Sequence, residues 1–172
     1  MAEQEEIEEH IHHAHEPFDK AVAGTMAGIA AFLAIVSVLG QHFNTEKLLN
    51  QQLSSDQWAF YQAKNIRRYS AQMAQDVLSQ LKAPPEAIAK YVADGKKYDT
   101  QMAEIQDKAR DYAKESDKTG HQADRFHLGE VFLEIAIVLS SLAILTKRRP
   151  IFIAGAGSAI AGLAIAATAY WA

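Results

Sequence analysis

Three side chains beside an apolar stretch have the types and spacing for proton or cation chemistry. His127, Glu130 and Glu134 are spaced i, i+3 and i+7, so they share one side of a helix. Carboxylates and imidazoles exchange protons and bind cations. A carboxylate inside a membrane helix is costly and by default marks a functional site. The spacing therefore predicts a proton or cation site, which in a homo-oligomer would form a ring of carboxylates.

A second interpretation is that these carboxylates lie at the hydrated edge of a shorter span. The charge-free run from Ile135 to Thr146 has only 12 residues, whereas a full span needs about 20. Glu130 would then lie at the membrane surface. No Lys or Arg occurs inside any predicted span to pair with Glu134. Glu134 would therefore be protonated, hydrogen-bonded, hydrated or bound to a cation.

The elements that position these residues are three predicted membrane helices. Residues 21–40 contain no charge over 20 residues, and residues 151–172 contain none over 22. Each run reaches across a hydrocarbon core of about 30 Å. The third apolar stretch, 128–146, is separated from the last by a short basic loop, Lys147-Arg148-Arg149-Pro150. We predict transmembrane helices at residues 21–43 and two more within residues 128–172.

Residues 44–127 between the first and second spans are predicted to form an antiparallel helical hairpin. Asn44 or Thr45 is expected to cap a new helix that runs to Leu81, because no Gly or Pro interrupts it. The chain must turn at Pro84-Pro85, since Pro suits the first turn of a helix and not its interior.

Each arm of this hairpin carries a seam with alternating steps of three and four residues, which is the spacing of packed helix pairs. We expect the two seams to face each other. The first seam consists of Ala59, Ala63, Ile66, Ser70, Met73 and Val77, and the second consists of Tyr98, Met102, Ile105, Ala109, Tyr112 and Ser116.

Small residues predict close helix contacts inside the membrane. Gly24 and Gly28 form a small-xxx-small pair in the first span, and Ser158 and Gly162 form another in the last. Such pairs let two helices approach closely. The sequence thus predicts a fold of the all-α class, with three spans and a long hairpin between spans one and two.

Composition narrows the functional classes. The net charge is −4 and there is no cysteine, which excludes disulfides and thiol catalysis. The acidic, His-rich tail of residues 1–20 has no basic region that would make it a cleavable signal. Neighbouring His residues in the tail can bind Zn²⁺ weakly, but a solvated tail is the simpler interpretation. We predict no metal site, no cofactor, no nucleic-acid partner and no enzymatic activity.

The basic loop also predicts an orientation. Lys147-Arg148-Arg149 lies between two adjacent spans, where the positive-inside bias acts best. The loop and the N-terminal tail are then cytoplasmic, and the hairpin lies outside. Basic residues between Lys108 and Arg125 argue the other way, although long loops largely escape the rule.

Several stretches resemble a bacterial family of uncharacterised membrane proteins, the domain of unknown function 4337. The resemblance rests on residues 12–17 (HHAHEP), 34–40 (AIVSVLG), 55–64 (SDQWAFYQAK), 125–126 (RF) and 135–146 (IAIVLSSLAILT). It implies a three-span protein of the bacterial inner membrane, with a periplasmic hairpin if the basic loop is cytoplasmic. It implies no activity.

The function expected from these observations is structural. The chain would be a membrane anchor in the lipid bilayer that forms a homo-oligomer or joins a larger membrane complex, with the hairpin as an interaction element. The alternative is a homo-oligomeric channel or proton-linked component that uses Glu134, Glu130 and His127.

Overall fold

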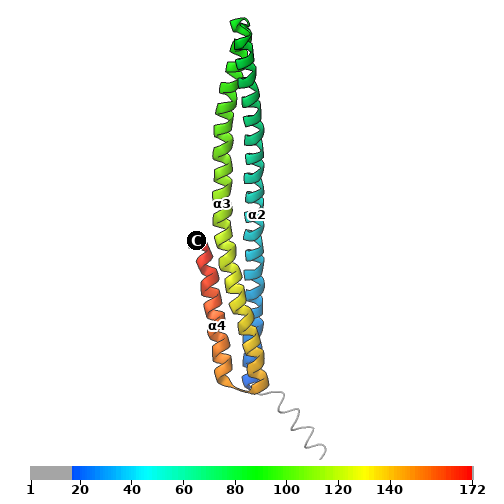
Figure 1. The fold of residues 1–172 in the computed structure, drawn as a ribbon. Coiled ribbons are helices and arrows are strands. Elements are labelled where there is room, and N and C mark those ends of the chain that lie inside the picture. Colours follow the sequence, from blue (N-terminus) through cyan, green and yellow to red (C-terminus); the bar gives the residue numbers. More distant parts are fainter. Residues whose placement is uncertain (1–16, 172) are drawn as a thin grey trace, which may run out of the picture. The chain divides into compact units, whose positions relative to one another are not determined.

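A computed structural model describes residues 17–171 and contains three long helices (Figure 1). Helix α2 covers Pro17–Gln80 with 64 residues, α3 covers Pro85–Thr146 with 62, and α4 covers Arg149–Ala167 with 19. A short 3₁₀ helix, η1, follows at Thr168–Trp171. Residues 17–171 contain no strand, which confirms the all-α prediction. Of the predicted tail, residues 17–20 begin α2, and residues 1–16 lie outside the described part of the chain.

Helix α2 runs without interruption through the position where a new helix was expected to begin. Asn44 and Thr45 both lie inside α2, so the prediction of a cap there was wrong. Two helix ends would leave backbone N–H and C=O groups without helical partners. Residues 41–80 contain no Gly or Pro that would break the helix. The chain therefore avoids the cost of two helix ends by continuing as one helix.

The connection between α2 and α3 occupies residues 81–84, where the two prolines predicted a turn. Lys82 has a positive φ of 51°. The Ala83 N–H donates to the Leu78 carbonyl at 3.0 Å, and the Lys82 N–H donates to the Ser79 carbonyl at 3.1 Å. These two bonds form a Schellman motif, which satisfies the last carbonyls of α2. Pro85 then starts α3, where a missing N–H costs nothing.

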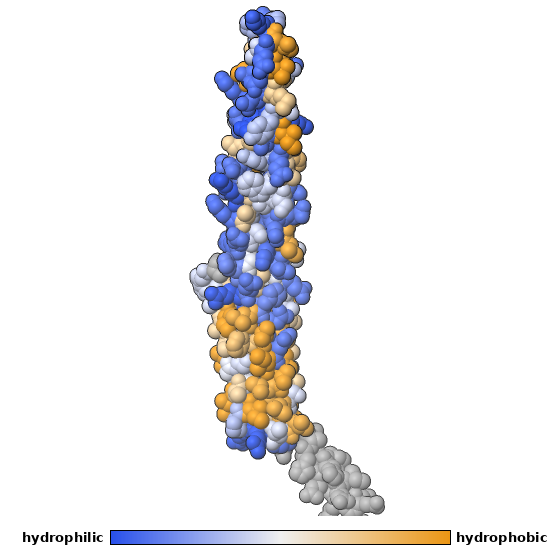
Figure 2. All heavy atoms as spheres, in the orientation of Figure 1, coloured by the Kyte–Doolittle hydropathy of each residue, from blue (hydrophilic) through white to orange (hydrophobic). Residues whose placement is uncertain are grey.

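The chain divides into two compact units. Residues 17–44 and 120–171 form a three-helix unit, and residues 45–119 form a two-helix unit. Within the described residues 17–171, three helices are long and apolar enough to cross a membrane: α2, α3 and the segment Arg149–Trp171. Figure 2 shows apolar side chains gathered over the three-helix unit, where all three helices expose large hydrophobic residues. Such a surface is compatible with a lipid environment.

The core of the three-helix unit is built from all three of its long helices. Val36 of α2, Leu133 of α3 and Ala159 of α4 are buried within one hydrophobic cluster. In Figure 1, α4 lies along the part of α3 that belongs to this unit. Three predicted spans therefore pack on one another, at positions spaced three and four residues apart along each helix.

In the two-helix unit, one predicted seam is a packing face and the other is not. On α3, Met102, Ala109 and Ser116 are buried as expected. On α2, Ile66 and Met73 are 67% and 69% exposed, so the first seam was assigned to the wrong face.

The α2 face that meets α3 is less apolar than the predicted seam. It includes the buried residues Ser54 and Ala71 and the half-buried Tyr61 and Arg68. A heptad pattern identifies an apolar face of a helix but does not identify what covers it. Long side chains such as Arg68 pack through their apolar stems, and a hydrophobic pattern does not register them.

Candidate functional site

Two of the three predicted proton or cation residues interact within the three-helix unit. His127 Nδ1 lies 3.2 Å from Glu130 Oε2, one helical turn away on α3. The Glu130 side chain is 22% exposed and the His127 side chain 46%. Glu134 lies two turns beyond His127 and is exposed on the outer surface of the unit. The structure thus brings together a carboxylate–imidazole pair, which can share a proton, and places the third residue outside it.

A glycine on α2 gives the histidine its position. A Cβ atom built on Gly40 would lie 3.2 Å from Phe126 Cβ and 3.4 Å from His127 Cε1. The absence of a side chain at Gly40 therefore lets α3 and the His127 ring approach α2 closely. Sequence reasoning placed Gly40 only at the end of the first charge-free run. The signal that could have found Gly40 is its place at the end of the first predicted span, which the order of the helices brings beside the start of the second.

Aromatic rings surround this end of the unit. Phe43 of α2 stacks on Phe126 of α3 with 5.5 Å between ring centroids and 9° between planes. Tyr170 of η1 meets Phe126 edge-on at 6.0 Å. Tyr and Trp favour the headgroup level of a bilayer. Tyr170 and Trp171 are 64% and 84% exposed, which suits that level.

The opposite end of the unit joins the basic loop to the start of α2. Lys147 Nζ contacts a carboxylate oxygen of Asp19. Phe18 and Phe152 meet edge-on at 6.1 Å. One cation of the loop is thus paired with an acid of α2, at the end of the three-helix unit away from Glu130.

The small residues predicted for helix contacts fall into two groups. Gly162 and Ser158 of α4 pack against α3: the Ser158 hydroxyl donates to the Phe132 carbonyl at 2.7 Å, and Gly162 lies against Gly129. Gly129 was not singled out from the sequence, although it precedes Glu130 directly. Gly24 and Gly28 of α2 have nothing within 4 Å of an added Cβ. Their close-approach face is uncovered by the described part of this chain.

The two-helix unit holds its arms together with polar contacts as well as with the α3 seam. The hydroxyl of buried Ser54 donates to the Ala109 carbonyl at 2.9 Å, and Ser116 donates to the Lys47 carbonyl at 3.0 Å. Both bonds join the beginning of one arm to the end of the other, as the antiparallel course of the two arms requires. Each satisfies a hydroxyl that burial would otherwise leave without water.

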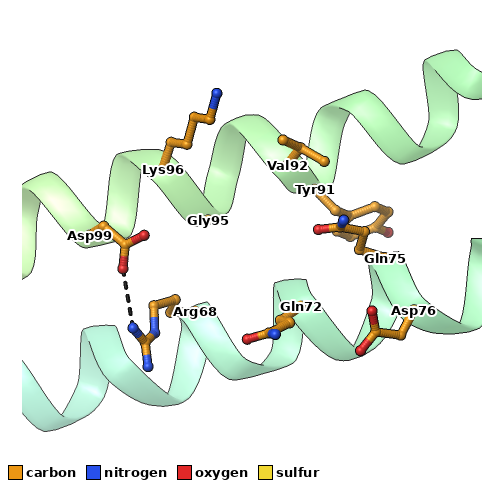
Figure 3. Close-up of a pocket in the computed structure, with 9 residues that line it drawn as sticks. All are labelled: Arg68, Gln72, Gln75, Asp76, Tyr91, Val92, Gly95, Lys96 and Asp99. Carbon is orange, nitrogen blue, oxygen red and sulfur yellow. Dashed lines mark hydrogen bonds and ion pairs between the residues drawn. The ribbon is translucent and has the colours of Figure 1, made fainter.

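An open polar pocket of about 260 Å³ lies between the arms (Figure 3). The Arg68 guanidinium donates a hydrogen bond to an Asp99 carboxylate oxygen across the pocket, at 3.3 Å. This hydrogen bond is the largest cause that raises the pKa of Arg68. Lys96 and Asp76 also line the pocket. Two cations and two carboxylates balance, so the pocket has no strong preference for the charge of a ligand.

The absence of a metal site in this chain stays a prediction from the sequence. Within residues 17–171, no group of three or more His, Asp or Glu side chains is placed to hold a metal ion. The weak Zn²⁺ interpretation concerned the His-rich tail at residues 1–16, outside the described part of the chain.

Comparison with known proteins gives a family. The model of the domain of unknown function (DUF4337) matches residues 18–172, which is nearly the whole chain. The chain belongs to this family. The match confirms the resemblance inferred from the sequence, and it includes the His127–Glu130 pair and the three long helices except the first residue of α2. No curated protein and no solved structure matches the chain. The family description assigns no activity, so function must be argued from the residues.

Proposed function

We propose that this protein is a structural component of a membrane, an oligomeric scaffold or an accessory subunit of a larger membrane complex. The three-helix unit is its anchor in the bilayer. Residues 45–119 form an antiparallel helical hairpin outside the bilayer and provide a surface for interaction. The apolar exterior of the three-helix unit supports the first part, because exposed Ile, Leu and Val side chains on all three helices are stable in lipid.

One observation carries the proposal of association: Gly24 and Gly28 lie on an uncovered face of α2. The glycines at 129, 155 and 162 are used inside the unit, where an added Cβ would touch a neighbouring helix. Helices associate in membranes largely by close packing of small residues. An unused close-approach face in a span therefore supports contact with a helix of another chain.

The test is association of the full chain in lipid nanodiscs or native membranes. Gly24→Leu and Gly28→Leu fill the uncovered face and should shift the particle mass towards single copies. Ala30→Leu is the matched control, because Ala30 is exposed on the same helix but lies on a different side of it from Gly24 and Gly28. Equal particle masses for all three variants and the unchanged protein would remove the support that Gly24 and Gly28 give.

A second candidate function is a homo-oligomeric channel or proton-linked component of the membrane. Exposure of Glu134 on the surface of a span favours it, because a carboxylate facing lipid is costly and contact with other copies or water removes that cost. Glu134→Gln separates the two functions. Intact assembly with lost proton or cation conductance supports the channel, and unchanged assembly and conductance count against any role for this carboxylate.

The orientation proposed from the basic loop places the hairpin outside the cytoplasm. Because the chain has no cysteine, single cysteines report accessibility directly. Ala103→Cys in the hairpin should react with a membrane-impermeant maleimide in intact cells. Arg148→Cys in the basic loop should react only after permeabilisation. The reverse pattern would invert the orientation.

A further inference from the structure

The outer face of α2 in the two-helix unit carries an apolar stripe that no described residue covers. We define the α2 stripe as Ala59, Ala63, Ile66, Ser70, Met73 and Val77, which follow one another at steps of 4, 3, 4, 3 and 4 residues. Ile66, Met73 and Val77 are 67%, 69% and 51% exposed. Phe60, Tyr69 and Leu81 flank the stripe and are also more than half exposed.

The outer face of α3 in the same unit has the opposite character. Residues 85–119 contain 15 charged side chains in 35 positions, whereas residues 48–80 contain 5 in 33. No large hydrophobic side chain of residues 85–119 is exposed. All exposed large hydrophobic residues of the two-helix unit thus belong to α2 and the residue directly after it. Water solvates the charged outer face of α3, whereas no described residue covers the apolar outer face of α2.

We propose that the α2 stripe is the contact face for a second copy of this chain, with two α2 helices packed in parallel as a two-stranded coiled coil. The inference deepens the proposed scaffold function and rests on it. Alternating steps of three and four residues are the spacing by which two helices interlock. Two copies in one bilayer share an orientation, so equivalent residues of their stripes face one another.

The charge distribution identifies the second copy's own stripe as the matching surface. If the α2 stripe packed on the α3 exterior of a neighbour, it would bury charges such as Lys97, Asp107 and Arg110, and unpaired buried charges are costly. The stripe of the second copy is apolar along the same length. The contact is therefore isologous, with the same patch used by both copies.

The stripe is large enough for a tethered dimer. Residues 59–81 extend about 34 Å along a straight helix. The three large residues of the stripe and the three that flank it, burying roughly 100 Å² each, would contribute about 600 Å² per copy, which reaches the lower end of specific interfaces. These six are Ile66, Met73, Val77, Phe60, Tyr69 and Leu81. Confinement in one bilayer raises the effective concentration of the second copy. Ala59, Ala63 and Ser70 are small and allow the two helices to approach closely.

The test uses two matched single cysteines in the full chain. Ala63→Cys lies in the stripe and Ala103→Cys lies on the outside of α3; both positions are exposed alanines, and the chain has no other cysteine. Under mild oxidation in nanodiscs or native membranes, Ala63→Cys should give most of the chain as a covalent dimer. Ala103→Cys should remain largely uncross-linked. Native mass measurement of the same particles gives the number of copies.

A second pair of variants tests the stripe without relying on disulfide geometry. Adding Met73→Lys to the Ala63→Cys chain places a charge in the apolar contact and should reduce the cross-linked dimer severalfold. Adding Lys97→Met instead should leave it unchanged. Both positions are exposed, so neither change disturbs the interior of the unit.

Three outcomes would overturn the inference, and each has a different consequence for the proposed scaffold function. Multi-copy particles with equal cross-linking at positions 63 and 103 would refute the stripe and leave the scaffold function standing. Single-copy particles without other proteins would refute both. Cross-linking of position 63 to a different protein would show that this protein, and not a second copy, packs on the α2 stripe. The chain would then be an accessory subunit.

Discussion

Gly129 of α3 and Gly162 of α4 pack backbone to backbone. A Cβ on Gly129 would lie 2.7 Å from the Gly162 carbonyl oxygen, and a Cβ on Gly162 would lie 2.8 Å from the Gly129 carbonyl oxygen. The contact is reciprocal and sets the distance between the two helices beside the His127–Glu130 pair. Ser158 adds its hydrogen bond to Phe132 one turn away.

Alanine at either glycine should therefore destabilise the three-helix unit. Gly129→Ala and Gly162→Ala force the backbones apart and are expected to cost about 1–3 kcal/mol, as overpacking does elsewhere. Thermal unfolding in detergent, followed by circular dichroism, measures the effect. Gly157→Ala is the control and should be neutral, because nothing lies within 4 Å of the added atom. Equal melting temperatures for the three variants would contradict this packing.

Ser54 and Ser55 provide a matched pair in the two-helix unit. The Ser54 hydroxyl is buried and bonds the Ala109 carbonyl of the other arm, whereas Ser55 bonds the Gln51 carbonyl of its own helix and is exposed. Ser54→Ala should lower stability by about 1 kcal/mol because the Ala109 carbonyl loses that donor. Ser55→Ala should have little effect. Hydrogen exchange of residues 45–119 in the full chain, read by mass spectrometry, distinguishes them.

Lys82 stores backbone strain at the connection between α2 and α3. Its φ of 51° is left-handed, a conformation that costs an L-residue about 1 kcal/mol and costs glycine nothing. Lys82→Gly should slow hydrogen exchange in the adjoining turns of α2 and α3. Lys82→Ala keeps the strain and should not. The same exchange rates in both variants would show that backbone strain is not what limits this turn.

Arg68 and Arg67 are adjacent on α2 and differ in their contacts. Arg68 pairs with Asp99 across the pocket of Figure 3, with side-chain exposures of 31% and 60%. Solvent screens such a pair, so Arg68→Ala should lower stability only slightly, and the loss should shrink at high salt. Arg67→Ala serves as the control on the same helix. A salt-independent loss specific to Arg68→Ala would show that packing of its stem, and not the ion pair, matters.

The sequence was sufficient where length and charge decide the structure. Charge-free runs and the Pro84-Pro85 pair located the apolar helices and the turn, because desolvated charges and missing N–H groups are costly wherever the chain folds. It was insufficient where tertiary packing decides. The Ile66 and Met73 spacing indicated a packed seam, but the described chain leaves that face uncovered.

The candidate site shows the same division. His127 and Glu130 lie one turn apart on a helix, so sequence spacing predicted their meeting. The role of Gly40 depends on contact between α2 and α3, which no local pattern encodes. The reciprocal contact of Gly129 and Gly162 likewise depends on how α3 and α4 align, since each glycine alone is an ordinary small residue in an apolar helix.

The most direct test of the scaffold function is the mass and composition of the particle extracted from native membranes with its lipids. We expect more than one chain per particle, either several copies of this protein or this protein bound to others. Several copies alone would identify a self-assembling scaffold, and additional proteins would identify an accessory subunit. A particle containing one copy and lipid only, at native abundance, would contradict the account.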